Sequence, residues 1–142
     1  MRVAFLLSVA ALLVSACMPR TEGTAPTAAA KPVDMHTSQN SLDWAGVYEG
    51  TLPCADCPGI KTRLTLNNDG SYELSTQYLN RQLAPQVLRG QFTWNAAGNA
   101  ITLDANGRGQ GFAVGEGRLT LLNGDGSSHT PPAPNRVLTR VP

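Results

Sequence analysis

Hydrophobic and polar positions alternate along most of the chain from Trp44 onward, which is the period of a β-strand rather than the 3.6-residue period of a helix. The clearest alternation runs over residues 60–66 and resumes over residues 71–78. Between these segments lies Asn68-Asp69-Gly70, and an Asp-Gly pair flanked by alternating residues is the strongest short-range hairpin signal. We therefore expect an antiparallel hairpin at this point.

Shorter alternating segments follow, separated by turn residues such as Asn, Gly and Asp. They cover residues 88–94, 101–103, 112–114, 119–122 and 137–141, and a proline-rich loop spans residues 127–134. No segment has a convincing helical period. Short strands at close spacing are typical of an antiparallel barrel or sandwich, and short connections favour sequential pairing. Residues 44–142 are therefore expected to form an all-β domain, a small antiparallel barrel of about eight short strands.

The first 16 residues follow a different pattern, because Met1-Arg2 precedes 12 residues, Val3 to Val14, in which only Ser8 is polar. A membrane-spanning helix needs roughly 20 apolar residues, whereas the hydrophobic part of a signal peptide has roughly 7–15. The next residues, Ser15-Ala16-Cys17, complete a sequence that resembles the bacterial lipobox. That resemblance implies cleavage before Cys17 and lipid attachment to its thiol and its new amine. The alternative is an ordinary signal peptide with an incidental cysteine.

Residues 17–43 contain few large apolar side chains and are rich in Pro, Thr, Ala and Ser. Such a segment buries too little surface to offset the entropy lost on ordering, so we expect a disordered tether. Met18, Met35 and His36 lie in it, and we interpret them as solvated linker residues rather than soft-metal ligands. Because lipoproteins retained in the inner membrane commonly carry Asp after the cysteine, Met18 favours the outer membrane, with membrane contact through the lipid anchor.

Composition narrows the classes of partner. The 142 residues carry a formal charge of +1, and 15% of them are charged. Without residues 1–16 the chain has ten basic and ten acidic side chains, because only Arg2 is lost. A neutral domain is poorly suited to capture a polyanion, so nucleic acid is not an expected partner. The length fits one domain, and the sequence leaves the oligomeric state open.

The chain has three cysteines, an odd number that needs an explanation in an exported protein. Lipid attachment at Cys17 leaves Cys54 and Cys57 as a pair. Exported compartments are usually oxidising, so a disulfide between them is the first expectation. The loop it closes is very short, so the bond would rigidify a turn more than it would stabilise the fold.

Other chemistry at Cys54 and Cys57 remains open. A thioredoxin-like site needs a βαβ context with the pair at a helix N-terminus, and a structural zinc site needs a second ligand pair. Two thiolates suit Cu(I) better, which would require the reduced pair. His129 would be a third ligand only if its loop folded back, and an exposed loop residue is the preferred interpretation.

No constellation of residues points to an enzyme. Both histidines lie in expected loops, there is no recognisable Ser/His/Asp set, and no phosphate-binding loop occurs. Asp104 and Glu116 are isolated acids that we expect to be solvated turn residues. Four aromatic side chains are candidates for a ligand pocket, although core packing is the default for such residues: Trp44, Tyr48, Phe92 and Trp94.

One stretch is specific enough to indicate a family. It reads Trp44-x-Gly46-x-Tyr48-x-Gly50-x-Leu52-Pro53-Cys54-Ala55-Asp56-Cys57-x-Gly59-Ile60, followed by Thr62-x-Leu64-x-Leu66 and Asp69-Gly70-x-Tyr72. This stretch resembles the N-terminal domain of the NlpE family, outer-membrane lipoproteins named for copper resistance and for envelope-stress signalling by surface sensing. The resemblance implies a small lipocalin-like β-barrel and carries the family's CxxC onto Cys54 and Cys57. Longer members add a second, oligonucleotide/oligosaccharide-binding-type domain, and this chain is expected to carry the first alone.

These observations lead to one expected function and two alternatives. The expectation is a non-enzymatic outer-membrane lipoprotein with a role in envelope-stress sensing or copper tolerance, acting with an envelope-stress sensor as partner. The first alternative is a periplasmic Cu(I)-binding module that uses Cys54 and Cys57. The second is a barrel that binds a small apolar ligand.

Overall fold

The computed structural model describes residues 36–142 except residues 82 and 132. The expected signal peptide (1–16), the lipid attachment point Cys17 and most of the tether lie outside the described residues and remain predictions. None of the helices in the part that is described is long and apolar enough to cross a membrane.

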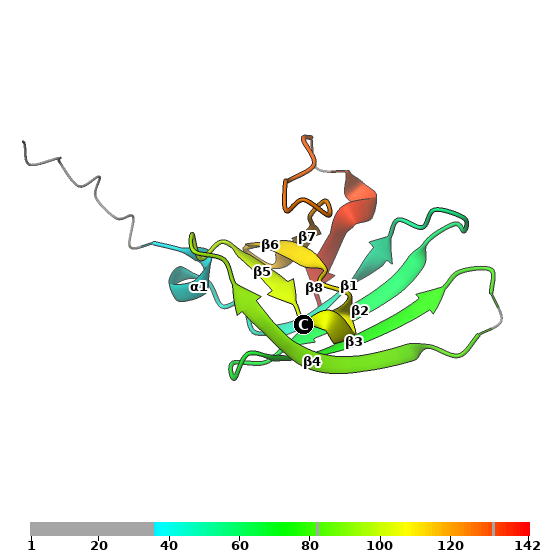
Figure 1. The fold of residues 1–142 in the computed structure, drawn as a ribbon, viewed down its shortest axis with the longest axis horizontal. Coiled ribbons are helices and arrows are strands. Elements are labelled where there is room, and N and C mark those ends of the chain that lie inside the picture. The colour runs from blue at the N-terminus through cyan, green and yellow to red at the C-terminus, as the bar shows by residue number, and fades with distance from the viewer. Residues whose placement is uncertain (1–35, 82, 132) are drawn as a thin grey trace, which may run out of the picture. The chain divides into compact units, whose positions relative to one another are not determined.

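The described residues form an eight-stranded closed barrel in which each strand pairs antiparallel with the next, and the last pairs with the first (Figure 1). The strands are β1 (Gly46–Leu52), β2 (Ile60–Leu66), β3 (Ser71–Tyr78), β4 (Gln86–Trp94), β5 (Ala100–Leu103), β6 (Gly111–Gly115), β7 (Arg118–Leu121) and β8 (Val137–Arg140). This confirms the all-β class, the antiparallel barrel and the sequential pairing. The expected hairpin at Asp69-Gly70 joins β2 to β3, and Leu64 lies opposite Leu74.

The sequence shows no convincing helix, and the described residues contain only three short helical segments. A four-residue helix, α1 (Ser38–Ser41), precedes β1, and two 3-10 turns, η1 (Ala105–Gly107) and η2 (Pro134–Arg136), lie between strands. They contain four, three and three residues, which is about one turn each. A hydrophobic period of 3.6 residues cannot be recognised in so short a segment.

Alternating side chains of every strand point into the barrel and form one core. Its buried members are Tyr48, Leu52, Leu64, Leu66, Tyr72, Leu74, Phe92, Ile101, Leu103, Phe112, Val114, Leu119 and Leu138. Thr62 is the only buried polar side chain among the described residues, and its hydroxyl donates to the carbonyl of Ile60 at 3.0 Å. The hydroxyl is therefore satisfied inside an otherwise apolar interior.

Aromatic side chains close one end of the barrel. The rings of Trp44 and Trp94 meet edge to face with centroids 5.4 Å apart, and Trp44 meets Phe92 in the same way at 5.8 Å. Tyr48 is fully buried and donates to the carbonyl of Trp44 at 2.7 Å. The four aromatic residues that were candidates for a pocket are thus part of the core packing.

Residues 37–43 also pack against this closed end, which corrects the expectation of a disordered tether for that part of the chain. The amide of Gln39 donates to the carbonyl of Gly98, and the hydroxyl of Ser38 donates to the carbonyl of Val114. The guanidinium of Arg140 donates to the carbonyl of Asp43 at 2.6 Å and to its carboxylate at 3.0 Å. Hydrogen bonds and one ion pair hold residues 37–43 against the barrel. Because these contacts are polar, no hydrophobic pattern in the sequence predicts the docking.

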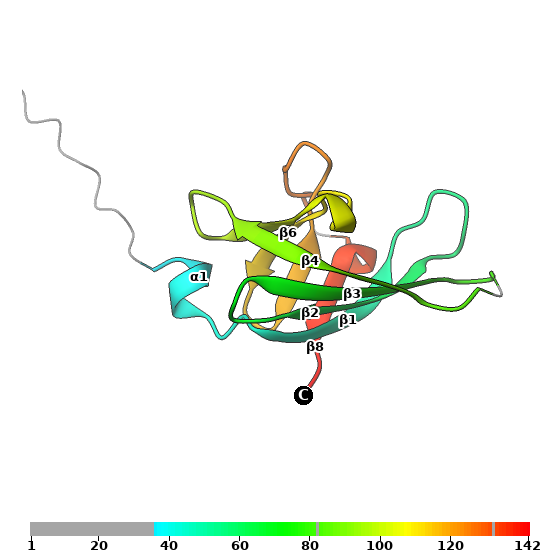
Figure 2. The same ribbon diagram turned by 60° about the horizontal axis from the view of Figure 1, so that its bottom comes forward.

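The other end of the barrel is more open, as the burial of inward-facing residues shows. Along β3, Tyr72 and Leu74 are buried, whereas Thr76 and Tyr78 are only half-buried. The β1–β2 loop and the β3–β4 turn lie at this end, opposite α1 (Figure 2). The two cysteines of the CxxC motif therefore lie at the rim of the open end.

Candidate functional site

The CxxC loop joins β1 to β2 and spans residues 53–59. The amide of Leu79, just after β3, donates to the carbonyl of Gly59 at 3.0 Å, which ties the loop to the β3–β4 turn. A Cβ on Gly59 would lie 2.4 Å from Cγ2 of Thr51, so the close approach of the loop to β1 requires glycine here. Prolines at 53 and 58 fix φ on both sides of the cysteines. The loop is therefore held at its base by strand contacts and stiffened by its own residues.

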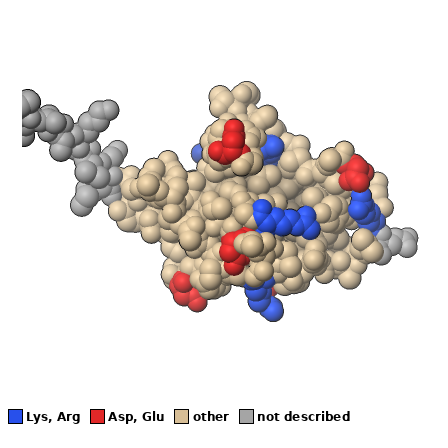
Figure 3. All heavy atoms as spheres, viewed as in Figure 1, with Lys and Arg blue, Asp and Glu red and all other residues tan. Residues whose placement is uncertain are grey.

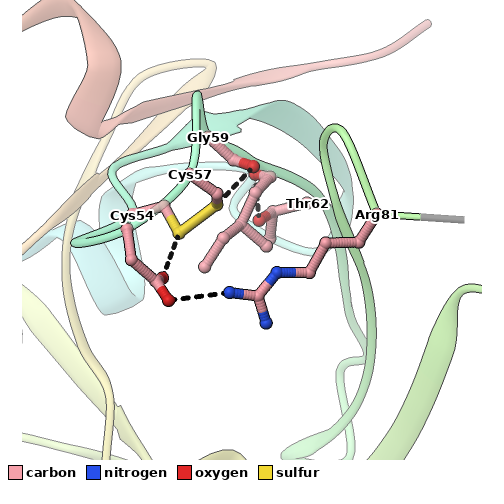
Figure 4. Close-up of a disulfide and its surroundings, with 7 residues drawn as sticks. Cys54, Cys57, Gly59, Thr62 and Arg81 are labelled. Carbon is pink, nitrogen blue, oxygen red and sulfur yellow. Dashed lines mark hydrogen bonds and ion pairs between the residues drawn. A yellow bond between two sulfur atoms is a disulfide. The ribbon is translucent and has the colours of Figure 1, made fainter. Parts of the chain in front are cut away.

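Cys54 and Cys57 form a disulfide, as expected first, with their Cα atoms 5.3 Å apart (Figure 4). Both are half-buried. Asp56 Oδ1 lies 3.5 Å from Cys54 Sγ, and the carbonyl oxygen of Gly59 lies 3.3 Å from Cys57 Sγ. A disulfide sulfur has no proton to donate, so these are contacts and not hydrogen bonds. They become hydrogen-bond partners only when the bond is reduced to thiols.

An ion pair connects the loop to the neighbouring β3–β4 turn. Nη2 of Arg81 lies 2.7 Å from Oδ2 of Asp56, and its guanidinium carbon lies 5.2 Å from the centroid of the Tyr78 ring (Figure 4). Both charged side chains are substantially exposed, at 43% for Arg81 and 72% for Asp56, so the pair contributes little to stability. Its effect is geometric, since it holds the loop beside the turn.

The loop also contains the only group of three potential metal ligands within the described ranges. One ligand atom from each of Cys54, Asp56 and Cys57 lies within 4.8 Å of the others. Thiolates are soft ligands that suit Cu(I), whereas the carboxylate is hard and already paired with Arg81. The sulfurs are joined to each other in this structure. The donor set therefore fits Cu(I) only after a two-electron reduction of the disulfide.

The remaining residues singled out from the sequence do not join this site. His129 is exposed on the loop between β7 and β8, and neither it nor His36 belongs to a group of metal ligands in the described part of the chain. Glu116 is exposed at the β6–β7 turn, as expected. The interpretation of His129 as a loop residue agrees with its exposure.

Asp104 corrects the sequence interpretation, because it is not a solvated turn residue. Oδ1 accepts the hydroxyl of Tyr72 at 2.7 Å and the amide of Asn106 at 3.1 Å, and Oδ2 accepts the amide of Gln91 at 2.9 Å. The amide of Gln91 is the main cause that lowers the pKa of Asp104, followed by the Tyr72 hydroxyl. Burial and the nearby carboxylate raise the pKa of Tyr72 to about 12. Asp104 thus fastens the turn after β5 to β3 and β4.

A family model for the NlpE N-terminal domain matches residues 48–131, which include both cysteines and Asp104. The chain belongs to this family. The resemblance first found in the sequence around the CxxC motif is thereby confirmed.

Two solved structures share the barrel. A crystal structure from Shewanella oneidensis, described as a lipoprotein, matches with a TM-score of 0.67 and 44% identity, over 73% of this chain and 94% of that chain. The Cpx pathway activator NlpE from Escherichia coli matches with a TM-score of 0.52 and 28% identity, over 58% of this chain and 43% of that chain. Since the Shewanella chain consists almost wholly of the matched barrel, we treat residues 34–142 as a unit that folds by itself.

Two curated relatives are also lipoproteins. Lipoprotein NlpE of Escherichia coli (strain K12) is 31% identical over 81 residues, and the 17 kDa lipoprotein of Treponema pallidum (strain Nichols) is 45% identical over 49 residues. The matches cover 56% and 34% of this chain, but only 34% and 31% of the relatives. This chain therefore spans about a third of the length of the curated relatives it matches.

Proposed function

We propose that this chain is a non-enzymatic lipoprotein of the outer membrane, anchored through Cys17, whose barrel activates an envelope stress response by contact with a signalling partner. The observation that carries the proposal is the match to the NlpE N-terminal domain, together with the structural similarity to a protein described as the Cpx pathway activator. The lipoprotein relatives support the anchor at Cys17.

The rim of the open end offers a surface suited to such contact. The disulfide, the two prolines and the Asp56–Arg81 ion pair limit the motion of the CxxC loop, so little conformational entropy is lost when a partner binds it. On the face seen in Figure 3, the described charged side chains lie in small groups of mixed sign within a broad uncharged surface. Such a surface favours recognition by shape and by individual side chains over attraction to a polyanion.

A reporter assay tests this function. The full chain is expressed in Escherichia coli that lacks its own NlpE and carries a Cpx-dependent reporter. We expect the reporter signal to rise above that of the empty vector. A flat signal at an amount of protein matched to a positive control would overturn the proposal.

Two variants test the membrane anchor and the contact at the rim separately. Cys17→Ala should abolish acyl labelling and membrane retention, and retention of the variant in the membrane fraction would remove the anchor assignment. Cys54→Ser with Cys57→Ser should lower the reporter signal if the rim makes the contact. The matched control is Ser127→Ala with Ser128→Ala in the exposed loop between β7 and β8, which should leave the signal unchanged.

A second candidate function is Cu(I) binding, which the spacing of Cys54, Asp56 and Cys57 favours. Cu(I) titration against a chromophoric chelator, with and without reductant, measures it. We expect no uptake by the oxidised protein and one equivalent after reduction, lost in Cys54→Ser and retained in Asp56→Asn. Absence of uptake by the reduced protein would exclude this function without affecting the reporter assay.

A further inference from the structure

A cavity of about 60 Å³ opens at the same end of the barrel as the CxxC loop. Its inner wall is formed mainly by aliphatic side chains from four strands, Ile60, Leu74, Leu88 and Leu121. These residues point inward on β2, β3, β4 and β7, and Leu74 lies directly opposite Leu88 in the register of β3 and β4. The aromatic cluster of Trp44, Phe92 and Trp94 lies at the other end of the barrel.

The mouth of the cavity has a different chemistry from its wall. Gln86, Gln110 and Arg108 are among its lining residues, and all three belong to segments at the rim of the open end. The side chain of Arg108 is exposed and has no ion pair or hydrogen bond with any other described residue. By contrast, Arg63, Arg81, Arg89 and Arg140 each pair with a carboxylate. The mouth therefore presents a free cation beside two amide groups.

The backbone holds Arg108 at this position in an unusual conformation. Its φ is 59°, in the left-handed region, where it ends the 3-10 turn η1. A non-glycine residue in this region costs free energy, and such residues concentrate at binding sites. The turn itself is fixed, because Asp104 accepts hydrogen bonds from the amides of Asn106 and Gly107. The guanidinium thus starts from a rigid base beside the cavity.

The size of the cavity sets the size of its ligand. A buried water occupies roughly 10–15 Å³ on this measure, so the cavity has room for about four to six waters. A methylene group fills nearly the same space as a water molecule. The aliphatic wall therefore accommodates an unbranched chain of about four to six carbons.

We infer that the open end of the barrel is a binding site for straight-chain monocarboxylates, with the alkyl chain among Leu74, Leu88 and Leu121 and the carboxylate beside Arg108. The wall supplies burial for the chain, and the free guanidinium supplies a charge-assisted hydrogen bond for the head. Branched or bulky ligands do not fit the volume, and a cationic head is repelled by Arg108. This site is independent of the proposed signalling role.

A chain-length series tests the inference on residues 34–142. Butanoate, hexanoate, octanoate and decanoate are titrated while the methyl resonances of the leucines are followed by NMR. Each added methylene that enters the cavity should tighten binding about fourfold. The gain should stop between hexanoate and octanoate, because about four to six carbons of the chain fill the cavity while the carboxyl carbon stays at the mouth. Affinity that still rises at decanoate, or methyl shifts that do not saturate, would overturn the site.

Two neighbouring positions on β4 give a matched pair of variants. Leu88→Trp fills the cavity and should weaken octanoate binding by more than tenfold, whereas Val87→Trp places the same side chain on the outer, exposed side of the strand and should not. Thr76→Leu, which adds less volume to the cavity wall, serves if Leu88→Trp does not fold. Equal effects of the two tryptophan variants would show adsorption to the barrel surface and refute the inference.

The head group has its own test. Arg108→Gln should weaken octanoate binding about threefold to tenfold and leave octanol binding unchanged, because only the carboxylate uses the charge. Arg118→Gln removes another exposed arginine without an ion pair in the described part and should have no effect. Octylammonium should bind more weakly than octanol. If Arg108→Gln changes octanoate and octanol equally, the carboxylate assignment is wrong.

Discussion

The hydroxyl of Tyr72 on β3 donates a 2.7 Å hydrogen bond to Oδ1 of Asp104, 32 positions later in the chain. Tyr72 is almost fully buried, so its hydroxyl depends on this one acceptor. The bond joins the strand that forms the hairpin with β2 to the turn that positions Arg108. Its contribution to stability can be measured on residues 34–142 alone.

Tyr72→Phe should lower the free energy of unfolding by about 1–2 kcal/mol, because it removes a hydrogen bond to a charged acceptor without leaving a large cavity. Urea denaturation followed by circular dichroism measures this loss. Tyr78→Phe is the matched control, since the Tyr78 hydroxyl has no hydrogen-bond partner among the residues described here. Equal stability of Tyr72→Phe and the unmodified barrel would show that the contact is dispensable.

The barrel should lose stability in acid, because three of its carboxylates have lowered pKa values in the folded state. The pKa of Asp104 lies below its ordinary 3.8 chiefly because of the Gln91 amide, and those of Asp69 and Asp125 do so chiefly because of the hydroxyls of Ser71 and Ser127. A lowered pKa in the folded state means that the unfolded chain binds protons first. The stabilisation is therefore complete only above about pH 5, well above the unfolded value, and is lost as the pH falls through the folded pKa values.

Melting temperatures recorded between about pH 6 and pH 2 measure this loss. Asp104→Asn should be less stable than the unmodified barrel at neutral pH and should lose less on acidification. Glu116→Gln, which removes an exposed acid without a partner in the described residues, should keep the original slope. An unchanged slope in Asp104→Asn would contradict the assignment of acid sensitivity to this carboxylate.

Gly90→Ala should destabilise the barrel by about 1–3 kcal/mol through overpacking. A Cβ at position 90 would lie 2.4 Å from Oδ2 of Asp104, so either the carboxylate or the strand must move. Gly124→Ala is the control, because nothing lies within 4 Å of a Cβ at that position. Thermal unfolding of the two variants compares them directly, and similar midpoints would argue against the close approach at Gly90.

Removal of the disulfide should affect local motion more than global stability. Cys54→Ser with Cys57→Ser opens a loop with a sequence separation of three, for which chain entropy predicts a loss of about 2 kcal/mol at most. Hydrogen exchange should become faster in residues 53–59 and at Leu79, whose amide bonds to Gly59. Faster exchange throughout the barrel would mean that the disulfide supports the whole fold.

Local patterns predicted the parts of this molecule that depend on neighbours in sequence. The alternation from Ile60 to Leu66 and the Asp69-Gly70 turn were enough to predict the hairpin. The disulfide was expected because Cys54 and Cys57 are the pair left over in an exported chain, and the structure contains it. Each of these features is determined within about ten residues, where propensity and turn chemistry act.

The features that were missed depend on distant partners. The role of Asp104 depends on Tyr72 and Gln91, and the docking of residues 37–43 depends on Gly98, Val114 and Arg140. A barrel with a small ligand cavity was left open as an alternative, but the place of the cavity was not predicted, because Leu74 and Leu88 have the same alternation as fully packed core residues. Which inward positions are left partly unfilled depends on the closure of all eight strands.

The docking of α1 at the closed end gives the molecule a direction. α1 lies at this end, and the β1–β2 loop, which carries the CxxC motif, and the β3–β4 turn lie at the opposite end (Figures 1 and 2). Whatever holds the upstream chain therefore acts on the barrel through its closed end. A force applied at this end acts first on the hydrogen bonds that Gln39 and Ser38 make with the barrel, before it reaches the strands at the open end.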